Sequence, residues 1–102
     1  LIGRDALASM KPTCLLINAA RGMLVDHAAL TDWLQANPQA HAVLDVHDPE
    51  PPEDGPLRHQ PNATLLPHLA SRTDTAMANM SGVVKDVWAV LNGEKPRYPA
   101  WS

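Results

Sequence analysis

Reactive side chains of three kinds follow three apolar segments of the chain. Arg21 lies in "NAARG", Asp45 and Glu50 lie in "DVHDPEP", and His68 lies in "LLPHLAS". A guanidinium can hold a carboxylate at two points, and a carboxylate beside an imidazole orients the ring and favours its protonated form. This combination suits proton transfer to a substrate that carries a carboxylate.

Each of these residues also has a purely structural interpretation. Most arginines are solvated or pair with surface carboxylates, and Gly22 beside Arg21 allows close backbone approach. His68 alone could be a structural histidine, and Glu50 alone could be a loop carboxylate. Asp45 could cap the following turn or accept a hydrogen bond from a ligand amide, and the sequence favours neither.

The apolar pattern indicates which elements position these residues. We expect a short helix over 5–10, a strand over 14–17, a helix capped by Asp26 and ended by Asn37-Pro38, and a strand over 42–46. A proline-rich loop, a third apolar segment over 63–68 and one long final helix follow, with a capping box at Ser71 and Asp74 and an end at Asn92-Gly93.

The strands are continuously apolar, which is typical of strands that helices cover on both faces. The order of elements predicts an α/β fold with parallel strands, in which ligands gather at the carboxyl ends of the strands. Three strands make a narrow sheet, and none of the five glycines forms a dinucleotide fingerprint. We therefore expect part of a larger sheet.

Composition narrows the class of protein. The 102 residues fit one small domain or part of a larger one, and the formal net charge of −3, without a cationic run, gives no nucleic-acid footprint. The apolar runs are too short for a membrane span and the start does not resemble a secretory signal, so we expect a cytoplasmic protein.

Other chemistries find little support. The histidines lack the HxH, HxxxH or HExxH spacing of a zinc site, so we expect no metal, and no G-x-S-x-G elbow of a serine hydrolase occurs. The single cysteine, Cys14, cannot form an internal disulfide, and its apolar surroundings favour a buried structural thiol over a reactive one. Trp33, Trp88 and Trp101 are interpreted as core or interface aromatics.

Three motifs in order resemble one known family. "LLINAARGMLVDHAALTDWL", "AVLDVHDPEPP" and "LLPHLASRTDTA" resemble the C-terminal part of the NAD(P)-binding domain of the D-isomer-specific 2-hydroxyacid dehydrogenases, over about residues 1–95. The resemblance implies a partial Rossmann-like, doubly wound parallel sheet. It also implies hydride transfer between NAD or NADP and a small 2-keto or 2-hydroxy acid.

The resemblance assigns roles to individual positions. Arg21 would bind the substrate carboxylate and carbonyl, His68 would be the general acid and base, and Glu50 would be its partner. Asp45 would face the nicotinamide carboxamide. The cofactor-binding residues would be Ala19, Ala20, Arg21, Asp45, His68, Ala70 and Ser71. His47 stands where the family usually has an aromatic residue.

The resemblance also implies what the chain does not contain. The glycine motif for the pyrophosphate, the residues that select NAD or NADP and most of the substrate domain would lie upstream of Leu1, so we expect a fragment that is inactive alone. We expect residues 93–102 to return toward the substrate domain and the parent to be a homodimer. The alternative is a non-catalytic nucleotide-sensing or association module with the same fold.

Overall fold

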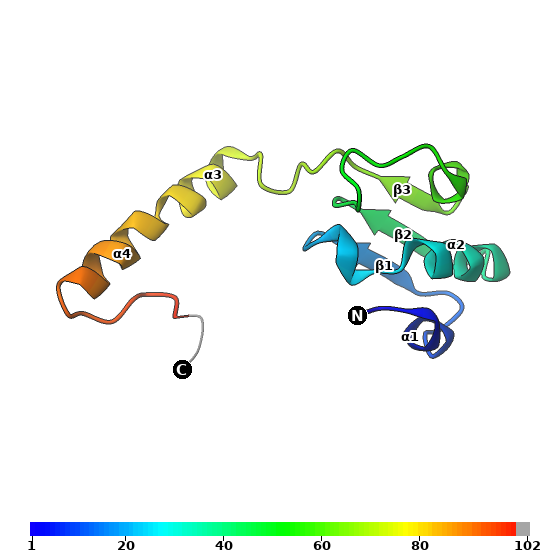
Figure 1. The fold of residues 1–102 in the computed structure, drawn as a ribbon, viewed down its shortest axis with the longest axis horizontal. Helices are drawn as coiled ribbons and strands as arrows, with labels where there is room; N and C mark the ends of the chain where they lie inside the picture. Colours follow the sequence, from blue (N-terminus) through cyan, green and yellow to red (C-terminus); the bar gives the residue numbers. More distant parts are fainter. Residues whose placement is uncertain (100–102) are drawn as a thin grey trace. The chain divides into compact units, whose positions relative to one another are not determined.

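The computed structural model describes residues 1–99 of the chain. The chain divides into two compact units, Leu1–Leu69 and a second that begins at Ala70 (Figure 1). Each unit is described by itself below.

The first unit is an α/β structure with one parallel sheet. Its elements are α1 (Arg4–Ala8), β1 (Leu15–Asn18), the 3₁₀ turn η1 (Gly22–Leu24), α2 (His27–Ala36), β2 (His41–Leu44), η2 (Pro56–His59) and β3 (Ala63–Leu65). The strands form one parallel sheet in the order β1-β2-β3, in which Ile17 pairs with Val43 and Val43 pairs with Thr64. The predicted parallel α/β sheet is confirmed. All three strands end at the same edge, so the segments that follow them start there.

The core of this unit lies beneath α2. Leu30 and Leu34 of the helix and Ala42 and Leu44 of β2 are buried in one apolar cluster with Leu7 of the first helix. The predicted cap of α2 is confirmed, because the Asp26 carboxylate accepts a hydrogen bond from the Ala29 N–H at 2.9 Å. This cap and the buried leucines fix α2, which connects the end of β1 with the start of β2.

One prediction about the sheet is wrong for the described chain. We expected both faces of each strand to be covered, but the side chains of Leu15 and Ile17 in β1 are 58% and 63% exposed. Leu16, on the opposite face of β1, packs against the core cluster. A continuous apolar run therefore indicated a strand correctly, but it did not show that this chain supplies both covers.

The second unit is helical. We predicted one final helix, whereas the structure has α3 (Asp74–Ser81) and α4 (Val83–Leu91), which follow one another with a break at Gly82. The predicted capping box at Ser71 is also wrong: Thr73 is the N-cap, and its hydroxyl accepts from the Ala76 N–H at 3.1 Å. Neither helix has a buried residue, so Trp88 is not a core residue here, and Trp101 lies outside the described residues.

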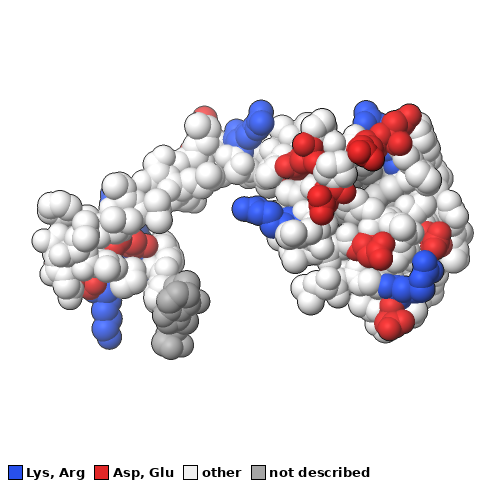
Figure 2. Space-filling view, in the orientation of Figure 1, with Lys and Arg blue, Asp and Glu red and all other residues white. Residues whose placement is uncertain are grey.

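The charged side chains of the first unit are mixed in sign. On the face shown in Figure 2, acidic groups and a few separate basic groups both occur on the first unit, and no continuous basic patch is visible. None of the described helices has the length and apolar content needed to cross a bilayer.

Candidate active site

The loop after β1 is fixed by the residue that ends the strand. Asn18 is buried, its Oδ1 accepts from the Ala20 N–H at 3.1 Å, and its Nδ2 donates to the Arg21 carbonyl oxygen at 2.9 Å. An asparagine side chain bonded to the backbone two residues on is a common turn device. The Asn18 side chain therefore holds the loop, while Ala19, Ala20 and Arg21 themselves are exposed to solvent.

Arg21 projects from this fixed loop into solvent. Its Nη1 donates to the carbonyl oxygen of Ala20 at 2.7 Å, and among the described residues it has no ion-pair partner. Its guanidinium retains further N–H donors, because one hydrogen bond uses only one of the five. A ligand carboxylate can therefore still pair with it.

Gly22 brings the loop after β1 against the loop after β2. A Cβ on Gly22 would lie 2.1 Å from the carbonyl carbon of His47 and 2.6 Å from the amide nitrogen of Asp48. No side chain fits at that separation, so the glycine is required by a close backbone approach. Arg21 thus stands next to the segment that carries Glu50.

Asp45 connects the end of β2 with the end of β3. Its carboxylate is buried, and Oδ1 accepts from the Leu69 N–H at 2.7 Å, one residue after His68. Neither of the two interpretations from the sequence included this bond. Its contact with a cofactor amide stays a prediction.

Glu50 and His68 form the central pair of the site. His68 Nδ1 lies 3.0 Å from Glu50 Oε2, and both side chains are about two-fifths exposed, at 40% and 39%. The hydrogen bond from His68 is the main cause that lowers the pKa of Glu50, so the carboxylate stays ionised. His68 Nε2 makes no hydrogen bond with any described residue and is free to exchange a proton with a ligand.

The backbone at His68 is unusual. Its φ of 57° places this non-glycine residue in the left-handed region, which side chains enter at an energetic cost. The bonds of Glu50 to the ring and of Asp45 to the next amide hold the residue there. Such conformations are concentrated at functional sites.

Of the predicted catalytic residues, the structure pairs Glu50 with His68, and it brings the backbone beside Arg21 against the segment that carries Glu50. Gly22, next to Arg21, packs against the backbone of His47, whose N–H points to Glu50 Oε1 at 3.4 Å, and Glu50 pairs with His68. Ala70 and Ser71 begin the second unit, so their predicted contact with a cofactor stays a prediction.

Sequence reasoning assigned no role to two residues that organise the site, Asn18 and His47. A signal for Asn18 was available, because an asparagine directly after a strand favours a turn bonded to its own side chain. His47 gave no such signal, since its ring bonds to a backbone carbonyl, that of Leu66, at 2.7 Å. Backbone partners far along the chain leave no trace in residue type.

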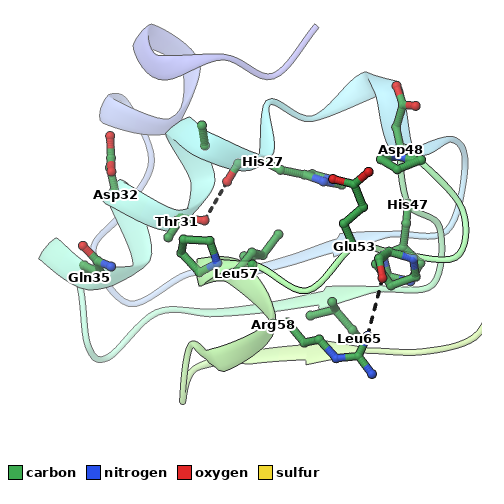
Figure 3. Close-up of a pocket in the computed structure, with 15 residues that line it drawn as sticks. His27, Thr31, Asp32, Gln35, His47, Asp48, Glu53, Leu57, Arg58 and Leu65 are labelled. Carbon is green, nitrogen blue, oxygen red and sulfur yellow. Dashed lines mark hydrogen bonds between the residues drawn. The ribbon is translucent and has the colours of Figure 1, made fainter.

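A cavity of about 430 Å³ lies beside the site, between α2 and the segment 47–58 (Figure 3). His27 and Thr31 line it from the helix, and His47, Leu57 and Arg58 line it from the segment. Burial, and then the nearby His47, lowers the pKa of His27. Arg21, Glu50 and His68 do not line this cavity, so it is separate from the Glu50–His68 pair. No group of three or more histidine, cysteine or acidic side chains within residues 1–99 is placed to hold a metal ion.

Known proteins of one family share this arrangement of sequence and fold. Residues 1–70 match the model of the D-isomer specific 2-hydroxyacid dehydrogenase, NAD binding domain. The chain is 45% identical over 96 residues to glyoxylate/hydroxypyruvate reductase B of Pectobacterium carotovorum, covering 92% of this chain and 30% of that protein. It is 36% identical to glycerate dehydrogenase of Cucumis sativus, covering 100% of this chain and 26% of the relative.

Solved structures agree with the sequence matches. An NADPH-dependent glyoxylate/hydroxypyruvate reductase from Sinorhizobium meliloti, in complex with NADP and malonate, superposes with a TM-score of 0.74 at 35% identity, over 98% of this chain and 32% of that one. D-lactate dehydrogenase with NAD+ from Lactobacillus jensenii gives 0.68 at 33% identity, over 99% and 35%. The chain thus spans about 30% of the length of the curated relatives it matches. It belongs to the D-isomer-specific 2-hydroxyacid dehydrogenases and carries part of their NAD-binding domain.

Proposed function

We propose that this chain supplies the proton-transfer and carboxylate-binding groups of an NAD(P)-dependent D-2-hydroxyacid dehydrogenase acting on a small 2-keto or 2-hydroxy acid. The observation that carries the proposal is the 3.0 Å contact between His68 and Glu50 at the carboxyl edge of the sheet, in a chain of this family. The similarity to glyoxylate/hydroxypyruvate reductases favours a short keto acid as substrate.

The proposed roles follow the charge that develops during reduction. Addition of hydride to the carbonyl carbon leaves negative charge on the oxygen, and His68 Nε2 donates a proton to it. Glu50 holds the orientation of the His68 ring by accepting a hydrogen bond from Nδ1. Because the pKa of Glu50 is lowered, the carboxylate stays charged and can accept this bond. Arg21 binds the substrate carboxylate and polarises the neighbouring carbonyl. In the oxidation direction His68 accepts the proton instead.

The nicotinamide supplies the hydride when the cofactor is bound. Ala19 and Ala20 are suited to a position beside the nicotinamide ring. Their side chains are small, so the exposed backbone of this rigid loop stays accessible to a flat ring. Asp45, Ala70 and Ser71 complete the proposed contacts with the nicotinamide half. Both NAD and NADP occur among the solved relatives.

We propose that the working enzyme is a longer protein that contains this chain, because the chain spans about 30% of the length of its relative. In that protein residues 93–102 would return to the substrate domain, and residues 100–102 of this segment lie outside the described residues. A homodimer in the cytoplasm is part of the same proposal. Each unit has exposed apolar side chains, such as Ile17 in the first and Trp88 in the second, and each of them supports contacts with an apolar partner.

Replacement of His68 by alanine in the complete enzyme tests the proposed function. We expect His68→Ala to lower kcat about 10²- to 10⁴-fold, because the proton donor is lost. The dissociation constant for the cofactor should change little. Turnover with glyoxylate and binding of NADH and NADPH are the measurements.

The matched control is His59→Ala. His59 also pairs with a carboxylate, Asp54, at 2.8 Å, but it lies in η2 and is exposed on the surface. Turnover of this variant should match the wild type. If His68→Ala keeps most of the turnover, the assignment fails. A wild-type protein that binds cofactor tightly but reduces no keto acid would favour the nucleotide-sensing alternative.

A further inference from the structure

We propose that the cavity between α2 and the segment 47–58 is an effector site for a small organic cation with an apolar body, whose binding stabilises the loop that carries Glu50. The cavity has a volume of about 430 Å³, which lies in the range of small-molecule sites. None of the proposed catalytic or cofactor-binding residues lines it, so its ligand is distinct from the keto acid and the nicotinamide. The effect on the loop rests on the proposed function, whereas the binding does not.

Apolar side chains supply much of the cavity wall. In Figure 3, His27 and Thr31 project from α2, and Leu57 projects from η2. Ala28 of α2 and Leu65 of β3 also line the cavity, and the segment adds three prolines, Pro49, Pro52 and Pro56. A ligand that fills this space therefore needs an apolar body such as an aromatic ring.

The polar groups of the wall are mainly hydrogen-bond acceptors. Thr31 is buried, with 7% of its surface exposed, and its hydroxyl donates to the His27 carbonyl oxygen at 2.7 Å. The Thr31 oxygen can therefore only accept a hydrogen bond from a ligand. The ionised carboxylates of Asp48 and Glu53 also accept only, and neither forms an ion pair with a described residue. The ligand should thus carry N–H or O–H donors.

The charges around the cavity favour a cation. Three carboxylates, those of Asp32, Asp48 and Glu53, line it together with one guanidinium, that of Arg58. Asp32 is already paired with Arg4 at 2.9 Å, which leaves two unpaired carboxylates against one guanidinium. A positively charged donor group gains from both the charge and the acceptors of this wall.

The two histidines of the wall do not oppose a cation. Burial, and then the nearby His47, lowers the pKa of His27, so this ring is neutral at pH 7. His47 Nε2 is engaged with the Leu66 carbonyl oxygen at 2.7 Å, and His47 is needed here only as part of the wall. The aromatic residue that the family usually has at this position would serve equally well.

The cavity touches the loop on both sides of Glu50. Asp48 and Pro49 precede Glu50 and line the cavity, as do Pro52 and Glu53, which follow it. The Glu50 carboxylate itself is turned to the site, where it bonds to His68 at 3.0 Å. A ligand that fits the cavity in this arrangement favours the arrangement over others. Occupancy should therefore hold Glu50 in place for its bond to His68.

Three probes of the same shape test the chemistry of the ligand with the 102-residue chain. Benzamidinium is a cation with N–H donors, benzamide is neutral, and benzoate is an anion. We expect benzamidinium to bind with a dissociation constant on the order of 1 mM, as is usual for so small a ligand. Benzamide should bind about fivefold more weakly and benzoate about tenfold. An NMR titration should show shifts at residues 27–35 and 47–58.

A pair of neighbouring carboxylates locates the charge contact. Glu53→Gln removes a lining carboxylate and should weaken benzamidinium binding about threefold, the effect of one exposed ion pair. Asp54→Asn is the matched control, because Asp54 pairs with His59 at 2.8 Å and does not line the cavity. This control should bind benzamidinium as the wild type does.

A pair of alanines on α2 locates the apolar contact. Ala28→Trp fills the cavity from an exposed position and should abolish benzamidinium binding. Ala36→Trp is the control, because Ala36 is exposed on the same helix but does not line the cavity. Melting temperatures of all variants are measured, and if Ala28→Trp does not fold, Glu53→Gln and Asp54→Asn decide the outcome.

The complete enzyme tests the effect on the loop. With saturating glyoxylate, benzamidinium should raise kcat about twofold, because it favours the arrangement in which Glu50 is bonded to His68. KM for glyoxylate should stay unchanged, since the probe does not compete for the substrate site. The Ala28→Trp enzyme should show no response to the probe.

Several results overturn the inference. Benzoate that binds at these segments as tightly as benzamidinium, or binding that Glu53→Gln leaves intact, overturns the cation site. A probe that binds in the cavity but leaves kcat unchanged, or that raises KM for glyoxylate, overturns the effect on the loop. By contrast, a wild-type enzyme that reduces no keto acid defeats the proposed function, while the titration of the chain still decides whether the cavity binds a cation.

Discussion

Helices α2 and α4 are both amphipathic but have different surroundings. α2 buries five residues, including Leu30 and Leu34, in the core of the first unit. α4 buries none, and its apolar residues Val83, Val87 and Leu91 are between 53% and 76% exposed. A helical period predicts which face is apolar, but the partner of that face depends on residues far away in sequence. The pattern thus predicted a helix in both places, but it did not predict that only α2 would be buried.

The proposed catalytic residues belong to the unit that has a core. Arg21, Glu50 and His68 all lie within Leu1–Leu69, on segments held by buried side chains such as Asn18 and Asp45. Sites on rigid elements keep their geometry better than sites on mobile ones. The first unit can therefore position these groups with its own contacts.

Truncation of one leucine in each helix tests the difference in burial most strongly. Leu30→Ala should lower the free energy of unfolding of the 102-residue chain by about 2–5 kcal/mol, since the side chain is fully buried. Leu91→Ala removes a side chain that is 76% exposed and should change it by about 0.5 kcal/mol or less. Urea denaturation measures both. Equal losses would show that α4 is buried in solution and would end the comparison.

A glycine pair tests whether the two loops of the first unit touch. Gly22→Ala places a methyl group against the His47 backbone and should destabilise the unit by about 3 kcal/mol, as overpacking does. Gly55→Ala is the control, because a Cβ there meets nothing within 4 Å. Thermal unfolding followed by circular dichroism compares the two variants. A Gly22→Ala protein as stable as the control would contradict the close approach.

Lowering the pH should decrease the free energy of unfolding of the first unit by less than Leu30→Ala or Gly22→Ala does. The decrease should occur in two steps. The pKa of His27 is lowered, mainly by burial, so its contribution is present above its ordinary pKa of 6.5 and is lost as pH falls through the lowered value. The pKa of Glu50 is also lowered, chiefly by the bond from His68, so its contribution declines below pH 4.5.

Unfolding free energies of the chain measured from pH 7.5 to about 2.5 test these steps. His27→Phe should flatten the curve near pH 6 and leave the change at lower pH in place. A wild-type protein that gained stability as the pH fell from 7 to 5 would contradict the sign for His27.

Local patterns predicted the elements of the first unit well. The Asp26 cap, the end of α2 at Asn37 and three parallel strands depend on contacts within a few residues or on simple periodicity. The final helix was harder, because Gly82 and Thr73 compete with equally plausible signals at neighbouring positions. Burial of β1 could not be read from sequence, since it depends on what covers Leu15 and Ile17.

The candidate site shows the same limit. Residue types at strand ends were enough to suggest that Glu50 and His68 meet, because parallel strands end at one edge. The bonds from His47 to Leu66 and from Leu69 to Asp45 were invisible, since one partner in each is backbone. Backbone groups are the same at every position, so they carry no signal in residue type.

A crystal structure of the complete enzyme with cofactor and a non-reducible 2-keto acid analogue tests the central claim most directly. The account predicts the Arg21 guanidinium within about 3 Å of the ligand carboxylate and His68 Nε2 within about 3 Å of the oxygen that replaces the keto group. Glu50 should still bond to His68 Nδ1. A ligand held by His68 while Arg21 points away from it, or a ligand that touches neither, would contradict the account.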